Sequence, residues 1–185
     1  SAGNAGTLAL GASTGGSARP LPSSAAAIPG AFSLLTDGAF LARGTVNTGT
    51  LPASGGGTRM MWFPNKSAFR VGTVTGAEWD GGNIGLYSTA MGFSTRATGD
   101  FSTAMGSLAL ASGAYSTAMG AATTASSNYS TATGTFTTAS GGASTAMGSG
   151  TLASGAVSTA MGLNTTASGG YSTAMGASTV ASGVY

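Results

Sequence analysis

The chain has 185 residues, and about two-thirds of them are glycine, alanine, serine or threonine. So few large apolar side chains cannot fill an ordinary globular core. Six basic residues against four acidic ones form no cluster that could release counterions from nucleic acid, so a nucleic-acid partner is excluded.

Residues 1–30 are rich in alanine, glycine, serine and proline, and we expect a low-complexity segment there, partly strand at 7–11. The chain begins at Ser1 without a methionine or a signal peptide, so we expect a fragment or a processed product. No run of 18 apolar residues occurs, and we therefore expect no insertion of this fragment into a membrane.

The segment 31–86 is predicted to be β-rich, with strands at 39–43, 58–63 and 68–74. Turns are predicted at Asp37-Gly38 and at Pro64-Asn65.

Both tryptophans of the chain fall in this segment, which indicates a folded cap. A solenoid needs such a cap because its first coil otherwise exposes an open strand edge. Trp62, Phe63 and Trp79 are the predicted core of the cap. Stacking of a ligand on Trp62 or Trp79 is the alternative interpretation.

Catalytic chemistry has little support in the composition. Histidine and cysteine are absent, which removes the usual metal sites and the Ser-His and Cys-His nucleophiles. Glu78 and Asp80 could form a glycosidase pair or a cation site, but a polar turn around Trp79 is favoured. Lys66-Ser67 is interpreted as a turn rather than a catalytic dyad. We expect no enzyme, no cofactor and no metal.

A repeat of 14 residues occupies 87–185. Six of the seven units contain Ser-Thr-Ala-Met-Gly and one contains a variant of it; the motif is usually preceded by an aromatic residue, and the unit ends in Ala-Ser-Gly or a close variant. Seven units follow one another without slippage. The motif begins at Ser88, Ser102, Ser116, Ser144, Ser158 and Ser172, with the variant Ser-Thr-Ala-Thr-Gly at Ser130.

A unit of 14 residues is too short for a helical hairpin. Its two glycines and its serine and threonine content also disfavour a helix. Two short strands joined by glycine turns fit the unit, so the sequence predicts an all-β solenoid, or β-roll, with parallel strands. A coil of this size encloses almost no volume, and its interior should take the small side chains. The predicted interior alanines are Ala90, Ala104, Ala118, Ala132, Ala146, Ala160 and Ala174.

The opposite face of the first strand carries methionine and aromatic columns. A continuous apolar ladder that faces outward normally marks an interface, so we expect copies of this sheet to pack around a rotation axis. The pattern does not determine the number of copies. The predicted interface residues are Met91, Met105, Met119, Met147, Met161, Met175, Tyr115, Tyr129 and Tyr171.

The repeats over 87–185 resemble the YadA-like head repeats of trimeric autotransporter adhesins, in period, glycines and alanines. The segment 57–86 is similar to a lead-in that precedes such repeats. The resemblance implies a left-handed parallel β-roll, a homotrimer, and a head exposed on the bacterial surface beyond the outer membrane. The family often has valine or isoleucine where this chain has threonine and methionine, and methionine keeps the ladder apolar.

The functional hypothesis is therefore a non-enzymatic adhesin head that attaches to host cells or extracellular matrix. The alternatives are a trimeric phage or fibre segment of the same fold and, with less support, an ice-binding solenoid built on the threonine column that begins at Thr89. Binding specificity is expected at variable outward positions such as Phe93, Leu108, Phe136 and Leu163. Arg96 and Asp100 are expected near a turn, as a weak surface pair at most.

Overall fold

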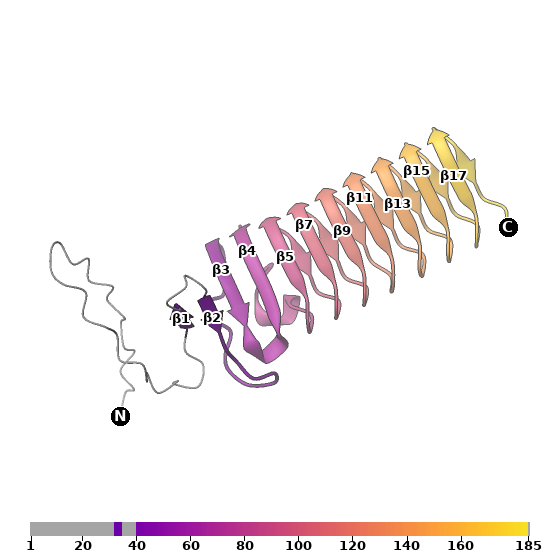
Figure 1. Ribbon diagram of the computed structural model, residues 1–185. Coiled ribbons are helices and arrows are strands. Elements are labelled where there is room, and N and C mark those ends of the chain that lie inside the picture. Colours follow the sequence, from indigo (N-terminus) through magenta and orange to yellow (C-terminus); the bar gives the residue numbers. More distant parts are fainter. Residues whose placement is uncertain (1–31, 35–39, 185) are drawn as a thin grey trace, which may run out of the picture.

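The computed structural model describes residues 32–34 and 40–184 (Figure 1). The segment 1–30 and the predicted turn at Asp37-Gly38 lie outside the described residues. The first two strands, β1 (Phe32–Leu34) and β2 (Phe40–Ala42), pair antiparallel with each other.

A β-hairpin precedes the repeats. Its strands β3 (Gly57–Phe63) and β4 (Ala68–Val74) are antiparallel and are joined by a 3₁₀ turn, η1 (Pro64–Lys66). Proline suits the start of this turn because its φ is already close to the helical value. β4 also pairs in parallel with β5, the first strand of the repeats, so this N-terminal hairpin continues the sheet of the solenoid.

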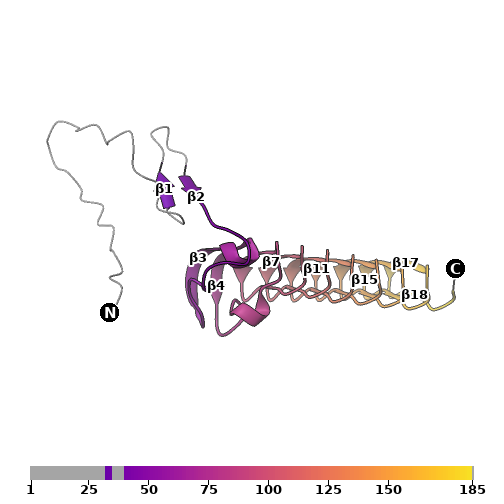
Figure 2. The same cartoon turned by 90° about the horizontal axis from the view of Figure 1, so that it is seen from below.

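The repeats wind into a solenoid of two sheets, seen as two layers in Figure 2. We call each 14-residue unit a coil, with the first coil at 87–100. The parallel strands of adjacent coils pair residues 14 positions apart, which confirms the predicted β-solenoid. The longer strands, in the nine-stranded sheet with β3 and β4, are β5 (Thr89–Phe93), β7 (Thr103–Ser107), β9 (Thr117–Ala121), β11 (Thr131–Thr135), β13 (Thr145–Ser149), β15 (Thr159–Leu163) and β17 (Thr173–Ala177). The shorter strands, in the seven-stranded sheet, are β6 (Arg96–Ala97), β8 (Leu110–Ala111), β10 (Thr124–Ala125), β12 (Thr138–Ala139), β14 (Leu152–Ala153), β16 (Thr166–Ala167) and β18 (Val180–Ala181).

Each coil turns at two corners, and each corner contains a residue in the left-handed region. A non-glycine residue in this region costs about 1–2 kcal/mol. The N–H groups at the corners nevertheless bond to carbonyls one turn of the solenoid earlier, as from Phe101 to Leu86 (2.7 Å) and from Leu108 to Phe93 (2.8 Å). These bonds offset the strain. With φ between 45° and 65°, the corner residues are Tyr87, Ser94, Phe101, Leu108, Tyr115, Ala122, Tyr129, Phe136, Ala143, Gly150, Val157, Asn164, Tyr171 and Ser178.

In every coil except the last, the glycine that ends the Ser-Thr-Ala-Met-Gly motif or its variant is required by a close approach to the next coil. Gly120 has a φ of +126°, and a Cβ at this position would lie 1.9 Å from the carbonyl oxygen of Gly134. The obstacle is backbone and cannot rotate away. Any side chain here would push two coils apart.

We predict that Gly120→Ala destabilises the fold by at least about 2 kcal/mol, because a clash is added to a strained φ. The matched control is Gly142→Ala, since nothing lies within 4 Å of a Cβ at Gly142. Urea unfolding of both variants measures the difference. Equal stability of the two variants would contradict the close approach.

The interior of the solenoid is filled by small side chains from both sheets. In the first coil Ser88, Ala90, Thr95 and Ala97 are all buried, at 0–1% exposure. The equivalent residues of the next five coils repeat this pattern, with Ala109 in the threonine column of the second coil, whereas Thr179 and Ala181 of the last coil are partly exposed. The buried threonine hydroxyls have no hydrogen-bond partner within the described part of the chain: Thr95, Thr123, Thr137, Thr151 and Thr165.

We predict that Thr137→Val stabilises the protein by about 1 kcal/mol, because an unpartnered buried hydroxyl is replaced by a methyl group of similar size. Thr138→Val is the control, since Thr138, the next residue, begins β12, lies on its outward side and is half-buried. Thermal unfolding compares the two variants. A loss of stability in Thr137→Val would show that the hydroxyl is bonded in solution.

Two buried side chains complete the hydrogen bonds at the first coil. Between successive coils a backbone N–H donates to a carbonyl of the following coil, as from Arg96 of the first coil to Ala109 of the second (2.8 Å). At the equivalent carbonyl of Thr95 the donor is Nε1 of Trp79 (2.8 Å). Nη2 of Arg70 donates to the carbonyl of Ala97 (3.1 Å). Side chains of the N-terminal segment therefore provide donors at the end of the seven-stranded sheet.

Arg70 lies in register with Ala90 and is fully buried. Its guanidinium also donates to the carbonyl and the hydroxyl of Ser88, both at 2.8 Å. Desolvation by burial lowers the pKa of Arg70 to about 10, so the group stays charged at neutral pH. A buried cation without neighbouring carboxylates depends on these oxygen acceptors.

We predict that Arg70→Ala destabilises the protein by about 2–4 kcal/mol, because it removes these hydrogen bonds and leaves a cavity. Arg96→Ala, at an exposed arginine, should change stability by at most about 0.5 kcal/mol. Chemical denaturation of both variants tests the assignment. Similar small effects would mean that Arg70 does not hold the first coil.

Candidate interaction surfaces

A column of methionines runs along the outward face of the nine-stranded sheet. Met91 pairs with Met105 in register, and the neighbouring Ala90 and Ala104 point into the coil, as strand alternation requires. Met119 is 40% exposed and Met175 is 60% exposed, and the other members are half-buried. We call this column the methionine ladder: Met91, Met105, Met119, Thr133, Met147, Met161 and Met175.

The apolar column continues onto the N-terminal hairpin, which sequence reasoning missed. Val71 pairs with Met91, and Met60 pairs with Val71. Met60 is 62% exposed. The alternation within 58–63 was the available signal, because it puts Met60 and Met61 on opposite faces of the strand.

The aromatic column lies at the first corner of each coil and not in the strand. We had expected it to share a strand face with the methionines. The strand begins two residues later, as at Thr89 after Tyr87, and the left-handed conformation at the corner breaks the alternation. Tyr115, Tyr129 and Tyr171 are more than half exposed. The structure therefore places them beside the methionine ladder, at the edge of its sheet.

The first four aromatic rings stack on one another along the corner. Their centroids are 4.8 Å apart for Tyr87 and Phe101, 4.7 Å for Phe101 and Tyr115, and 5.2 Å for Tyr115 and Tyr129. These distances follow the spacing of adjacent strands, about 4.8 Å. Ring faces cover one another inside the stack, and the edges of the rings are exposed.

Of the three residues predicted for the core of the cap, two are buried and one is half-buried. Phe63 and Trp79 are buried, at 5% and 0% exposure. Trp62 is half-buried on the outward face of β3 and pairs with Phe69, which in turn pairs with Thr89. All seven predicted interior alanines are buried.

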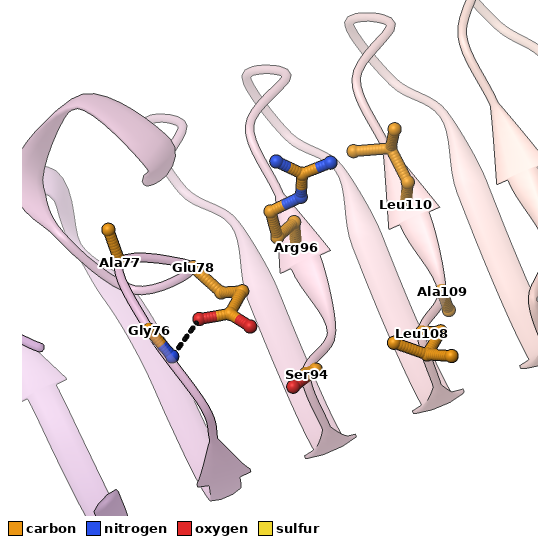
Figure 3. A pocket seen from close by; sticks show the side chains of 8 residues that line it. All are labelled: Gly76, Ala77, Glu78, Ser94, Arg96, Leu108, Ala109 and Leu110. Atoms are coloured by element: carbon orange, nitrogen blue, oxygen red, sulfur yellow. Dashed lines mark hydrogen bonds between the residues drawn. The ribbon is translucent and has the colours of Figure 1, made fainter. Parts of the chain in front are cut away.

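A pocket of about 330 Å³ opens where the loop after β4 meets the second corners of the first two coils (Figure 3). We call it the outer pocket, and sequence reasoning missed it because its parts come from three separate segments. It is lined by Gly76, Ala77, Glu78, Ser94, Arg96, Leu108, Ala109 and Leu110.

The carboxylate of Glu78 is held firmly at the edge of this pocket. The hydroxyl of Thr75 donates to Oε1 (2.9 Å), and the N–H of Gly76 donates to Oε2 (2.7 Å). Burial raises the pKa of Glu78, but hydrogen bonds from its own backbone N–H and from Thr75, Gly76 and Ser94 outweigh burial and lower the pKa to about 2. Glu78 is therefore ionised at neutral pH.

The other polar candidates hold backbone groups. Oδ1 of Asp80 accepts the N–H of Gly55 (2.7 Å), so Asp80 and Glu78 serve separate loops. Nζ of Lys66 donates to two carbonyls of a short 3₁₀ helix, η2 (Gly81–Asn83). One belongs to Gly81, the first residue of the helix, and the other to Ile84, its C-cap. Lys66 is thus engaged as a hydrogen-bond donor.

Among residues 32–34 and 40–184 no group of acidic side chains could hold a metal ion. Oδ1 of Asp100 accepts the N–H of Leu86 (2.8 Å), and no ion pair between Asp100 and Arg96 forms in the structure. Neither described helix is long and apolar enough to cross a membrane.

These features define a class: a parallel β-solenoid built from 14-residue repeats, with columns of like residues along its surface. The YadA head domain repeat matches residues 84–109, 111–137, 139–165 and 167–185, which is just over half of the chain. The chain belongs to the YadA head domain family, a structural family of the adhesin type. A search of curated proteins gave no match.

Proposed function

We propose that this chain is the head of a trimeric bacterial surface adhesin, which attaches to host cells or extracellular matrix without catalysis. The observation that carries the proposal is the methionine ladder on a solenoid of the YadA head family. The head is a left-handed roll that stands beyond the outer membrane, as in adhesins of this type.

The trimer is proposed to form through the methionine ladder. A soluble protein rarely leaves a long apolar column in water. Packing of the same face from three chains around one axis buries each ladder and closes the assembly. Val71 and Met60 extend the contact over the N-terminal hairpin. The apolar core that one narrow coil cannot hold is thus shared between chains.

We propose that the N-terminal hairpin is the cap of each protomer. β4 covers the strand edge of β5, and Arg70 and Trp79 supply donors to the seven-stranded sheet. Such covering prevents the first coil from pairing with strands of other proteins. The pairing of β4 with β5 also fixes the position of Met91, the first methionine of the ladder, relative to the hairpin.

We predict that Met119→Asp converts the trimer into monomers at micromolar concentration, because a charge is placed among apolar side chains without a partner. Thr124→Asp adds the same charge on the other sheet, at a half-buried outward position, and should leave the trimer intact. Light scattering gives the mass of each protein.

Attachment of the same three proteins to cells and to collagen, fibronectin and laminin tests the adhesive role. The wild type and Thr124→Asp should attach, and Met119→Asp should attach more weakly because it presents one site instead of three. A wild-type monomer would contradict the proposed assembly. A wild-type trimer that attaches to none of these surfaces would contradict the adhesive function.

A further inference from the structure

The outer pocket lies apart from the methionine ladder. Arg96 and Leu110 are on the outward side of the seven-stranded sheet, whereas the ladder is on the nine-stranded sheet. Packing of three chains through the ladder therefore leaves this sheet facing outward. The pocket needs a different explanation from self-association.

Arg96 brings a positive charge to the pocket without a partner of its own. Its side chain is exposed, and within the described ranges its guanidinium forms no ion pair or hydrogen bond. A guanidinium presents a planar fork of donors that matches the two oxygens of a carboxylate. The chemistry of Arg96 thus selects a ligand with an acidic group.

Glu78 contributes a negative charge and hydrogen-bond acceptors to the pocket. Thr75 and Gly76 already donate to its two oxygens, which fixes the negatively charged carboxylate in place at the edge of the pocket, where it can act only as a hydrogen-bond acceptor. A ligand that binds Arg96 through its acid must therefore present hydroxyl or N–H donors towards Glu78. A simple anion lacks these donors and would be repelled by Glu78.

Leu108 and Leu110 give the pocket an apolar wall. Leu108 is 57% exposed, although it occupies a left-handed corner where the backbone is strained. The volume of about 330 Å³ lies at the lower end of the range for small-molecule sites. It suits a single ring-sized group and not a helix or strand of another protein.

We propose that the outer pocket binds a carboxylated sugar at the end of a glycan. The carboxylate pairs with Arg96, ring hydroxyls donate to Glu78, and an apolar face of the ring packs on Leu108. A rigid sugar ring offers all three groups together at a low cost in conformational entropy. This inference rests on the proposed adhesive function, because it names the ligand class of that surface.

The test is calorimetric titration of the full chain with N-acetylneuraminic acid and with glucuronic acid, against neutral N-acetylglucosamine. We expect binding of at least one acidic sugar and none of the neutral one. Arg96→Gln should weaken this binding at least about tenfold, because a charged hydrogen bond is lost. Arg43→Gln removes the same charge from another exposed position and should bind as the wild type does.

An acetylated peptide rich in glutamate serves as the competing probe. Tighter binding of the peptide than of either sugar would overturn the proposal in favour of a protein ligand. Retained sugar binding in Arg96→Gln would also overturn it, and so would the absence of sugar binding in the wild type.

Attachment assays on the same preparations separate this proposal from the proposed function. A wild-type trimer that attaches to cells or matrix but binds neither acidic sugar overturns the pocket assignment and leaves the adhesive function standing. Sugar binding by a protein that attaches to no surface supports the pocket chemistry and counts against the adhesive function.

Discussion

Backbone lies directly against backbone where successive coils meet. A Cβ at Gly92 would lie 2.0 Å from the carbonyl oxygen of Gly106, and the same contact recurs along the solenoid. Because each coil is so flat and narrow, its interior accepts serine, alanine and threonine and little else. A single chain therefore buries little apolar surface. The methionines and aromatic residues lie outside the coil as a direct result.

The period and the alternation of small residues were enough to predict the parallel solenoid, because a strand pattern repeated every 14 residues leaves few other structures. The corners were harder. Tyr115 looked like part of a strand because nothing in its neighbours reveals a positive φ at a non-glycine residue. Arg70 and Trp79 were also beyond prediction as partners of Ala97 and Thr95, since the residues of these two pairs lie 27 and 16 positions apart in the chain.

The two sheets present surfaces of different chemistry. The nine-stranded sheet presents apolar side chains in register, which favours an identical surface as its partner. The seven-stranded sheet is lined outward mainly by threonine, serine and leucine, and its one arginine, Arg96, lies in the outer pocket. Charge is so scarce in the repeats that each charged group stands out. A pocket of mixed polarity therefore occurs where the N-terminal segment adds Glu78 to the coils.

The pairing of residues 14 positions apart has a consequence for insertions and deletions. Gain or loss of a whole coil changes the length of the rod by about 4.8 Å and leaves every column in register. Gain or loss of a single residue within a strand moves the alanines outward and the methionines inward along that strand. Tandem duplication can therefore alter the reach of the head without altering its cross-section, whereas small insertions are tolerated only at the corners.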